Sequence, residues 1–124
     1  MSKWYNVWNI YCTVSADNES ELDKHEIEIK SAIQKIIKQR KLDVACVKCT
    51  NRNLFIPGSN KSWSDNDFET DDVEPGITMT IYVENADTMQ ILLDHFDKVR
   101  AKLGVWIMEN EKVDLIREED LMTI

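Results

Sequence analysis

Hydrophobic and polar residues alternate over the first fourteen positions of the chain, which predicts a β-strand spanning residues 4–14. One face of this strand carries mainly large apolar side chains, namely Trp4, Trp8, Ile10, Cys12 and Val14. The other face carries Tyr5, Val7, Asn9, Tyr11 and Thr13. Only the first face has the composition of a protein core, so we expect the second face to remain open.

The spacing of apolar residues then changes to that of an amphipathic helix. Ser20 with Asp23 three residues later resembles an N-cap before an acidic first turn, and we expect the helix to end near Lys41. Its buried side is predicted to consist of Leu22, Ile29, Ile33, Ile36 and Ile37. The alternation over residues 25–29 would also suit a short strand. Residues 43–50 are rich in β-formers and apolar on both faces, which predicts a second strand.

A third strand and a second helix follow after a long connection. Residues 77–84 alternate strictly between apolar and polar side chains. Asn85 or Asp87 can cap the next helix, and Gly104 stands where a left-handed residue ends one. The buried stripe of this helix is predicted to be Met89, Leu92, Leu93, Phe96, Val99 and Leu103.

The end of the chain predicts a fourth strand over residues 105–108. Asn110 and Glu111 would suit a turn that makes a hairpin with an extra C-terminal strand at residues 113–116. The acidic tail that follows has no clear pattern.

The order strand, helix, strand, strand, helix, strand predicts an α+β, two-layer, ferredoxin-like sandwich formed by residues 1–124 as a single domain. Right-handed connections then place both helices on one face of an antiparallel sheet with strand order 4-1-3-2. The first and third strands lie side by side in that order, so their outward residues form a face rich in Tyr and Thr. Because Tyr is enriched at interfaces, Tyr5, Tyr11 and Tyr82 are a candidate homodimer face.

The chain is strongly acidic, with a net charge of -8 and a pI near 4.7. Such a charge repels nucleic acid and anionic membranes and favours basic partners. An RNA-binding module exists on this fold, but its third-strand motif requires a basic residue, a glycine and two aromatics. The third strand here reads Ile-Thr-Met-Thr-Ile-Tyr-Val-Glu, so we expect no direct contact with nucleic acid.

The sequence predicts a cytoplasmic protein. Its N-terminus lacks the continuous apolar segment of a signal peptide, and no stretch approaches the 18 apolar residues of a membrane span. Three cysteines are an odd number, which does not suit a fully paired secreted framework.

Residues 51–76 form a connection far longer than is usual between strands, and such loops are either disordered or functional. The loop combines dense negative charge with aromatic residues, which predicts a clamp for a basic protein surface. The predicted partner-binding residues are Trp63, Asp65, Asp67, Phe68, Glu69, Asp71, Asp72 and Glu74. A solvated loop is the plain alternative. A calcium loop fails because Thr70 and Gly76 replace the required Gly and bidentate Glu.

Catalytic and metal-binding patterns are weak in this chain. Cys46 and Cys49 form a C-x-x-C, but residues three apart in a strand point to opposite faces, so we expect no metal site. His25 and His95 have no nucleophile or carboxylate partner suggested by spacing, and the common phosphate-loop and hydrolase motifs are missing. We therefore expect no enzymatic activity and no cofactor.

These observations favour a binding protein that acts as an inhibitor or adaptor. Its expected partner is a basic protein surface, such as a nucleic-acid-binding groove, which the acidic aromatic loop would engage as a mimic of nucleic acid. Two alternatives stay open: a regulatory domain that senses a small molecule, and a dimeric assembly subunit.

Overall fold

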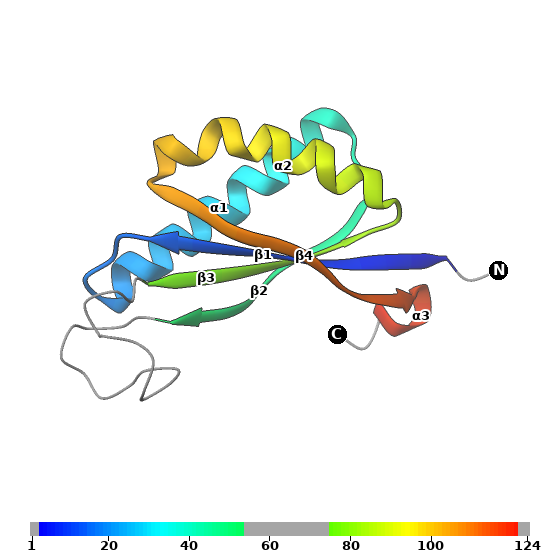
Figure 1. Ribbon diagram of the computed structural model, residues 1–124, viewed down its shortest axis with the longest axis horizontal. Helices are drawn as coiled ribbons and strands as arrows, with labels where there is room; N and C mark the ends of the chain where they lie inside the picture. Colours follow the sequence, from blue (N-terminus) through cyan, green and yellow to red (C-terminus); the bar gives the residue numbers. More distant parts are fainter. Residues whose placement is uncertain (1–2, 54–74, 122–124) are drawn as a thin grey trace.

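Four antiparallel strands and two long helices form two layers in the part of the chain that the computed structural model describes, residues 3–53 and 75–121 (Figure 1). The elements are β1 (Trp4–Val14), α1 (Glu19–Arg40), β2 (Val44–Asn53), β3 (Gly76–Val83), α2 (Ala86–Arg100), the 3₁₀ turn η2 (Ala101–Leu103), β4 (Val105–Arg117) and the short α3 (Glu118–Leu121). Helices α1 and α2 lie on one side of the sheet (Figure 1). We call the other side the open face. The ferredoxin-like α+β sandwich is thereby confirmed.

The strand order is β2-β3-β1-β4, which is the predicted order read from the other edge. Strands β1 and β3 pair without interruption at the centre, from Asn6 opposite Val83 to Thr13 opposite Gly76. Opposed residues of an antiparallel pair share a face, so this register fixes which side chains point toward the helices.

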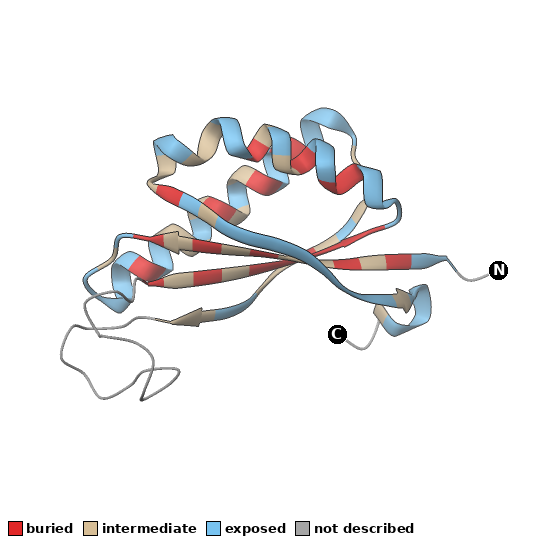
Figure 2. Cartoon of the chain, in the orientation of Figure 1, coloured by how far each residue is buried: buried red, intermediate tan, exposed pale blue. Residues whose placement is uncertain are grey.

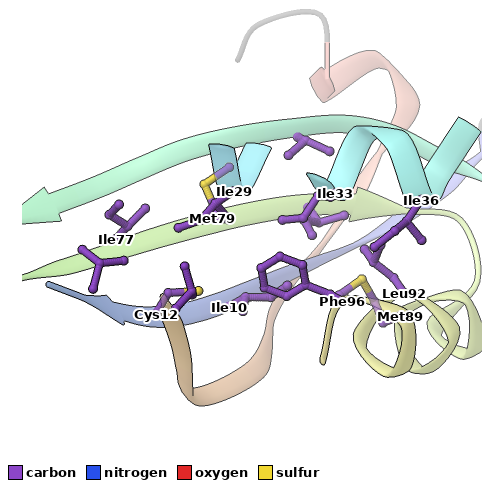
Figure 3. Packing of buried hydrophobic residues seen from close by; sticks show 14 of the residues in the cluster. Ile10, Cys12, Ile29, Ile33, Ile36, Ile77, Met79, Met89, Leu92 and Phe96 are labelled. Atoms are coloured by element: carbon purple, nitrogen blue, oxygen red, sulfur yellow. The ribbon is translucent and has the colours of Figure 1, made fainter. Parts of the chain in front are cut away.

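The main core fills the space between the sheet and the two helices (Figure 3). Phe96 of α2 is completely buried, as are Ile10 of β1, Met79 of β3 and Ile33 of α1. Figure 2 shows the corresponding pattern, with buried residues on the inner sides of the helices and solvent-exposed residues outside. Each such side chain stabilises the fold by roughly 1.5–3 kcal/mol.

Helix α1 begins differently from the prediction and ends, as predicted, near Lys41. Its N-cap is Asn18, whose Oδ1 accepts a hydrogen bond of 2.9 Å from the backbone N–H of Glu21, and Ser20 lies inside the first turn. Extended backbone at Asn18 lets the short amide side chain reach that N–H. At the other end Lys41 takes a left-handed conformation with φ of 51°, and its N–H bonds to the carbonyl of Ile37. Residues 25–29 are helical, so the alternative strand is absent there.

The N-terminus of helix α2 is capped by a side chain from a distant part of the chain. Asn85 is the N-cap residue, as predicted, but its side chain makes no cap hydrogen bond. Asp43, just before β2, accepts hydrogen bonds from the backbone N–H and the side-chain amide of Asn85, at 3.0 and 3.1 Å, and from the Thr88 hydroxyl. Gly104 after η2 is left-handed, as predicted, with φ of 69°.

The predicted hairpin at Asn110 and Glu111 is wrong, because β4 continues unbroken to Arg117. The eleven-residue β1 is long enough to pair with β4 along its whole length, from Trp4 opposite Arg117 to Val14 opposite Val105. The register shifts twice, so that Met108 and Val113 are extra residues with no opposed residue in β1. These two bulges absorb the excess length of β4 without a turn.

Candidate binding surface

Strand β4 forms one edge of the sheet, and no described strand pairs with its outer side. Large apolar side chains are exposed along it: the exposed fraction is 51% for Trp106, 67% for Met108, 45% for Val113 and 47% for Leu115. Most of β4 is accordingly coloured as exposed in Figure 2. Apolar side chains gathered on an unpaired edge strand are unusual, since such an edge readily pairs with another chain. We call β4 with these side chains the edge surface.

Three carboxylates of the edge surface lie on the open face. Glu109, Glu111 and Asp114 are opposed to Tyr11, Asn9 and Val7, which are alternate residues of β1 and therefore share one side of the sheet. Asp114 reaches this side only because the bulge at Val113 shifts the alternation by one residue. The bulge thus brings a third negative charge into line with the other two.

A continuous row of hydrogen bonds crosses the open face and ends at one of these carboxylates. The hydroxyl groups of Thr50 in β2 and Thr80 in β3 lie 2.7 Å apart, and Thr80 donates to Oδ1 of Asn9 at 2.7 Å. The Asn9 amide donates to the Tyr11 hydroxyl at 3.2 Å. The Tyr11 hydroxyl in turn donates to Oε1 of Glu111 at 2.9 Å. We call these five residues the polar ladder. Because Thr80 donates to Asn9, Thr50 must donate to Thr80, so every bond points toward Glu111.

The sequence did not reveal the edge surface, because the prediction divided β4 into two short strands and a turn. The hydrogen bonds of the polar ladder join residues from all four strands, so no local sequence pattern predicts them. The one available signal was the run from Trp106 to Leu115, in which every residue but Asn110 is charged or apolar and no Gly or Pro ends the strand.

The three tyrosines predicted as a homodimer face lie on the open face, but two of them are already covered within the chain. Tyr5 is 9% exposed and Tyr82 is 7% exposed, whereas Tyr11 is half-buried in the polar ladder. The expectation that this whole face is open is therefore wrong. Burial raises the pKa of Tyr82, with smaller contributions from Cys46 and Asp114. Dimer formation through these residues stays a prediction.

The residues predicted to bind a partner through the acidic loop lie outside the described part of the chain. They are Trp63, Asp65, Asp67, Phe68, Glu69, Asp71, Asp72 and Glu74. The structure describes only the two ends of residues 51–76. Asn53 at the end of β2 is opposed to Gly76 at the start of β3, so the segment between them connects two neighbouring antiparallel strands.

The cysteines of the C-x-x-C lie on opposite sides of the sheet, as predicted. Cys46 is opposed to Tyr82 on the open face, and Cys49 is opposed to Met79 on the helix side. Burial raises the pKa of Cys49 to about 11, and Glu26 adds to the shift. Burial also raises the pKa of Cys12, on β1, to about 12. Thiols with such pKa values are poor nucleophiles at neutral pH.

Other polar groups contact one another in ways that explain the fold. His25 lies with Nε2 3.0 Å from the carbonyl oxygen of Ser15, which ties α1 to the end of β1. Arg52 in β2 forms ion pairs with Asp23 and Glu26 of α1.

Among residues 3–53 and 75–121, no group of three or more His, Cys, Asp and Glu side chains has the arrangement of a metal site. No helix in these same ranges is both long and apolar enough to cross a membrane.

Comparisons with known proteins find similarity of structure alone. No family model matches the chain, and no curated protein matches its sequence. Among solved structures, the chain is similar to a hydantoinase/carbamoylase family amidase from Burkholderia ambifaria, with a TM-score of 0.50 and 10% identity. That match covers 91% of this chain but only 28% of the amidase. The 30S ribosomal protein S6 from Thermotoga maritima has a TM-score of 0.41 and 14% identity over 96% of this chain and 92% of its own. At such identities the likeness to the amidase concerns the fold and carries no activity or ligand.

Proposed function

We propose that this protein is a non-enzymatic binding protein that engages a basic surface of a partner protein, as an inhibitor or an adaptor. The observation that supports this most directly is the edge surface. Trp106, Met108, Val113 and Leu115 offer apolar area next to the carboxylates of β4. Apolar and aromatic contacts supply most of the affinity of an interface, and complementary charge speeds the encounter and selects the partner.

The acidic loop is the second part of this proposal. Six carboxylates between Asp65 and Glu74, with Trp63 and Phe68 among them, combine the same two kinds of side chain. This proposal for the loop rests on the sequence. A nucleic-acid-binding groove on the partner would suit both surfaces, because carboxylates can take the place of phosphates beside Lys and Arg.

The proposed location is a reducing compartment such as the cytoplasm. Cys12, Cys46 and Cys49 are all free thiols. The positions of Cys46 and Cys49 on opposite sides of β2 also argue against a disulfide between them. Free thiols persist in a reducing compartment, where disulfides are rare.

Affinity capture from host-cell lysate at several salt concentrations tests the proposal. Two charge-neutralising variants are compared with the wild type: E109Q/E111Q/D114N in β4, and D65N/D67N/D71N/D72N in the loop. The matched control for β4 is E84Q/D87N/D94N, which removes three exposed charges at the end of β3 and along α2. We expect a basic protein that the wild type and the control retain, that salt releases, and that at least one of the two variants loses. Equal recovery by all four proteins would contradict the proposal.

A further inference from the structure

The outer side of β4 offers a backbone as well as side chains. As the last strand of the sheet, β4 uses only one of its two sides for hydrogen bonds to β1. The N–H and C=O groups of an edge strand that point away from the sheet can pair with an added strand. The thirteen residues of β4 are long enough for a partner of ordinary strand length.

A second copy of the chain does not suit the central part of this edge. In a symmetric antiparallel pair, opposed residues share a face, so the pairing centres on one residue. Centring on Asn110 opposes Glu109 to Glu111, and centring on Glu111 opposes that carboxylate to its own copy. Centring on Lys112 opposes two lysines. Like charges directly opposed across strands are destabilising, so each central register is unfavourable.

The same charges favour a basic strand. Glu109 and Glu111 are alternate residues of an uninterrupted segment, and the bulge at Val113 aligns Asp114 with them on the open face. A strand beside β4 with Lys or Arg at alternate positions would place a cation near each carboxylate, because opposed side chains in a sheet approach to about 5 Å. The intervening residues would face the helix side, where β4 presents Asn110 and Lys112, with Ile107 and Leu115 at the two ends. Uncharged residues suit these positions, because a cation would be repelled by Lys112, and apolar ones can contact Ile107 and Leu115.

The polar ladder prepares one of the carboxylates for this contact. Glu111 is exposed, yet the Tyr11 hydroxyl holds its Oε1 at 2.9 Å, and the row of bonds continues through Asn9 to Thr80 and Thr50. A carboxylate already fixed in position loses less side-chain entropy when a cation binds it.

We propose that an extended segment of the partner, with Lys or Arg alternating with apolar residues, binds as a fifth strand along the outer edge of β4. This inference rests on the proposed function and specifies how the basic partner is bound. Main-chain hydrogen bonds supply affinity in this mode, and the alternate side chains supply specificity.

Titration of the isotope-labelled protein by NMR tests the inference with two synthetic probes. The first probe is a short peptide of alternating lysine and valine, and the second is the same peptide with N-methylated backbone nitrogens, which keeps the charge and removes the donors. We expect only the first probe to bind and to slow hydrogen exchange of amides in residues 105–117. The variant E109Q/E111Q/D114N should bind it roughly tenfold more weakly, since each exposed ion pair contributes modestly. The control E84Q/D87N/D94N should bind as the wild type does.

The outcomes separate the two proposals. If both probes bind equally and β4 amides gain no protection, strand addition is wrong while binding of a basic partner stands. If the first probe protects amides of β2 instead, the site on β4 is wrong. If neither probe binds, or if the charge variant binds as tightly as the wild type, both the strand addition and the part of the proposed function that rests on β4 are overturned.

Discussion

Replacing Thr80 by valine breaks the polar ladder at its most buried point. Thr80 is 4% exposed, and its hydroxyl donates to Asn9 and accepts from Thr50, each at 2.7 Å. Valine has nearly the same shape but makes neither bond. A hydrogen bond contributes about 1 kcal/mol net, so the loss of two costs about 2 kcal/mol. Burying a methyl group in place of the hydroxyl returns up to about 1 kcal/mol. We therefore expect Thr80→Val to lower the free energy of unfolding by about 1 kcal/mol.

Thr78→Val is the matched control for this change. Thr78 lies two residues away on the same face of β3, is half-buried, and makes no side-chain hydrogen bond among the described residues. We expect its replacement to be neutral or slightly stabilising, because valine favours strands. Urea unfolding of the three proteins, with equal m-values, measures both changes. If Thr80→Val is as stable as Thr78→Val, the polar ladder contributes nothing to the stability of the sheet.

Three further predictions concern the ends of the helices and the core. Asp43→Ala should lower the free energy of unfolding by about 1–2 kcal/mol in urea unfolding, because it removes the only described side-chain cap of α2; an unchanged value would refute that role. Lys41→Gly should raise the melting temperature, because Lys41 has a left-handed backbone conformation that glycine adopts without strain. The control Arg40→Gly, inside α1, should lower the melting temperature, and a fall for both variants would contradict strain at Lys41. Cys12 has a folded-state pKa near 12 against 9.0 when unfolded, so it stays protonated where the unfolded chain ionises. The contribution of Cys12 to stability should then be nearly constant well below pH 9 and fall by up to about 1.4 kcal/mol per pH unit above it. The stability of Cys12→Val should therefore fall less steeply than that of the wild type over pH 9–10.5, and parallel curves would refute the shift.

The regular elements were predictable because hydrophobic spacing is a local property. The switch from alternation to helical spacing located β1, α1, β3 and α2 to within a few residues, and the topology followed from their order. The faces of Cys46 and Cys49 were predictable for the same reason, because alternation alone fixes them.

Features that depend on distant residues were not predictable in this way. Asp43 caps α2 from more than forty positions away, and no capping pattern near Asn85 reveals it. Tyr5 and Tyr82 look like open-face residues by alternation, yet both are buried in the folded chain. Asn110 and Glu111 suit a turn locally, but the length of β1 supplies pairing partners that keep β4 extended. In each case a tertiary contact outweighs a local preference.

The charges on β4 can serve two purposes at once. Natural edge strands often carry charged residues that prevent identical chains from pairing, and Glu109 with Glu111 meets that need in the registers centred on the middle of β4. Charges that served only to prevent pairing of identical chains would not need exposed apolar side chains beside them. Trp106 and Met108, however, are more than half exposed beside those carboxylates. Such charges would also not need a carboxylate held in one position. The polar ladder nevertheless holds Glu111 through hydrogen bonds that reach across the sheet to Thr50. An edge that disfavours its own copy in the central registers, exposes apolar area and fixes a carboxylate in advance would suit the partner that we propose, a basic strand.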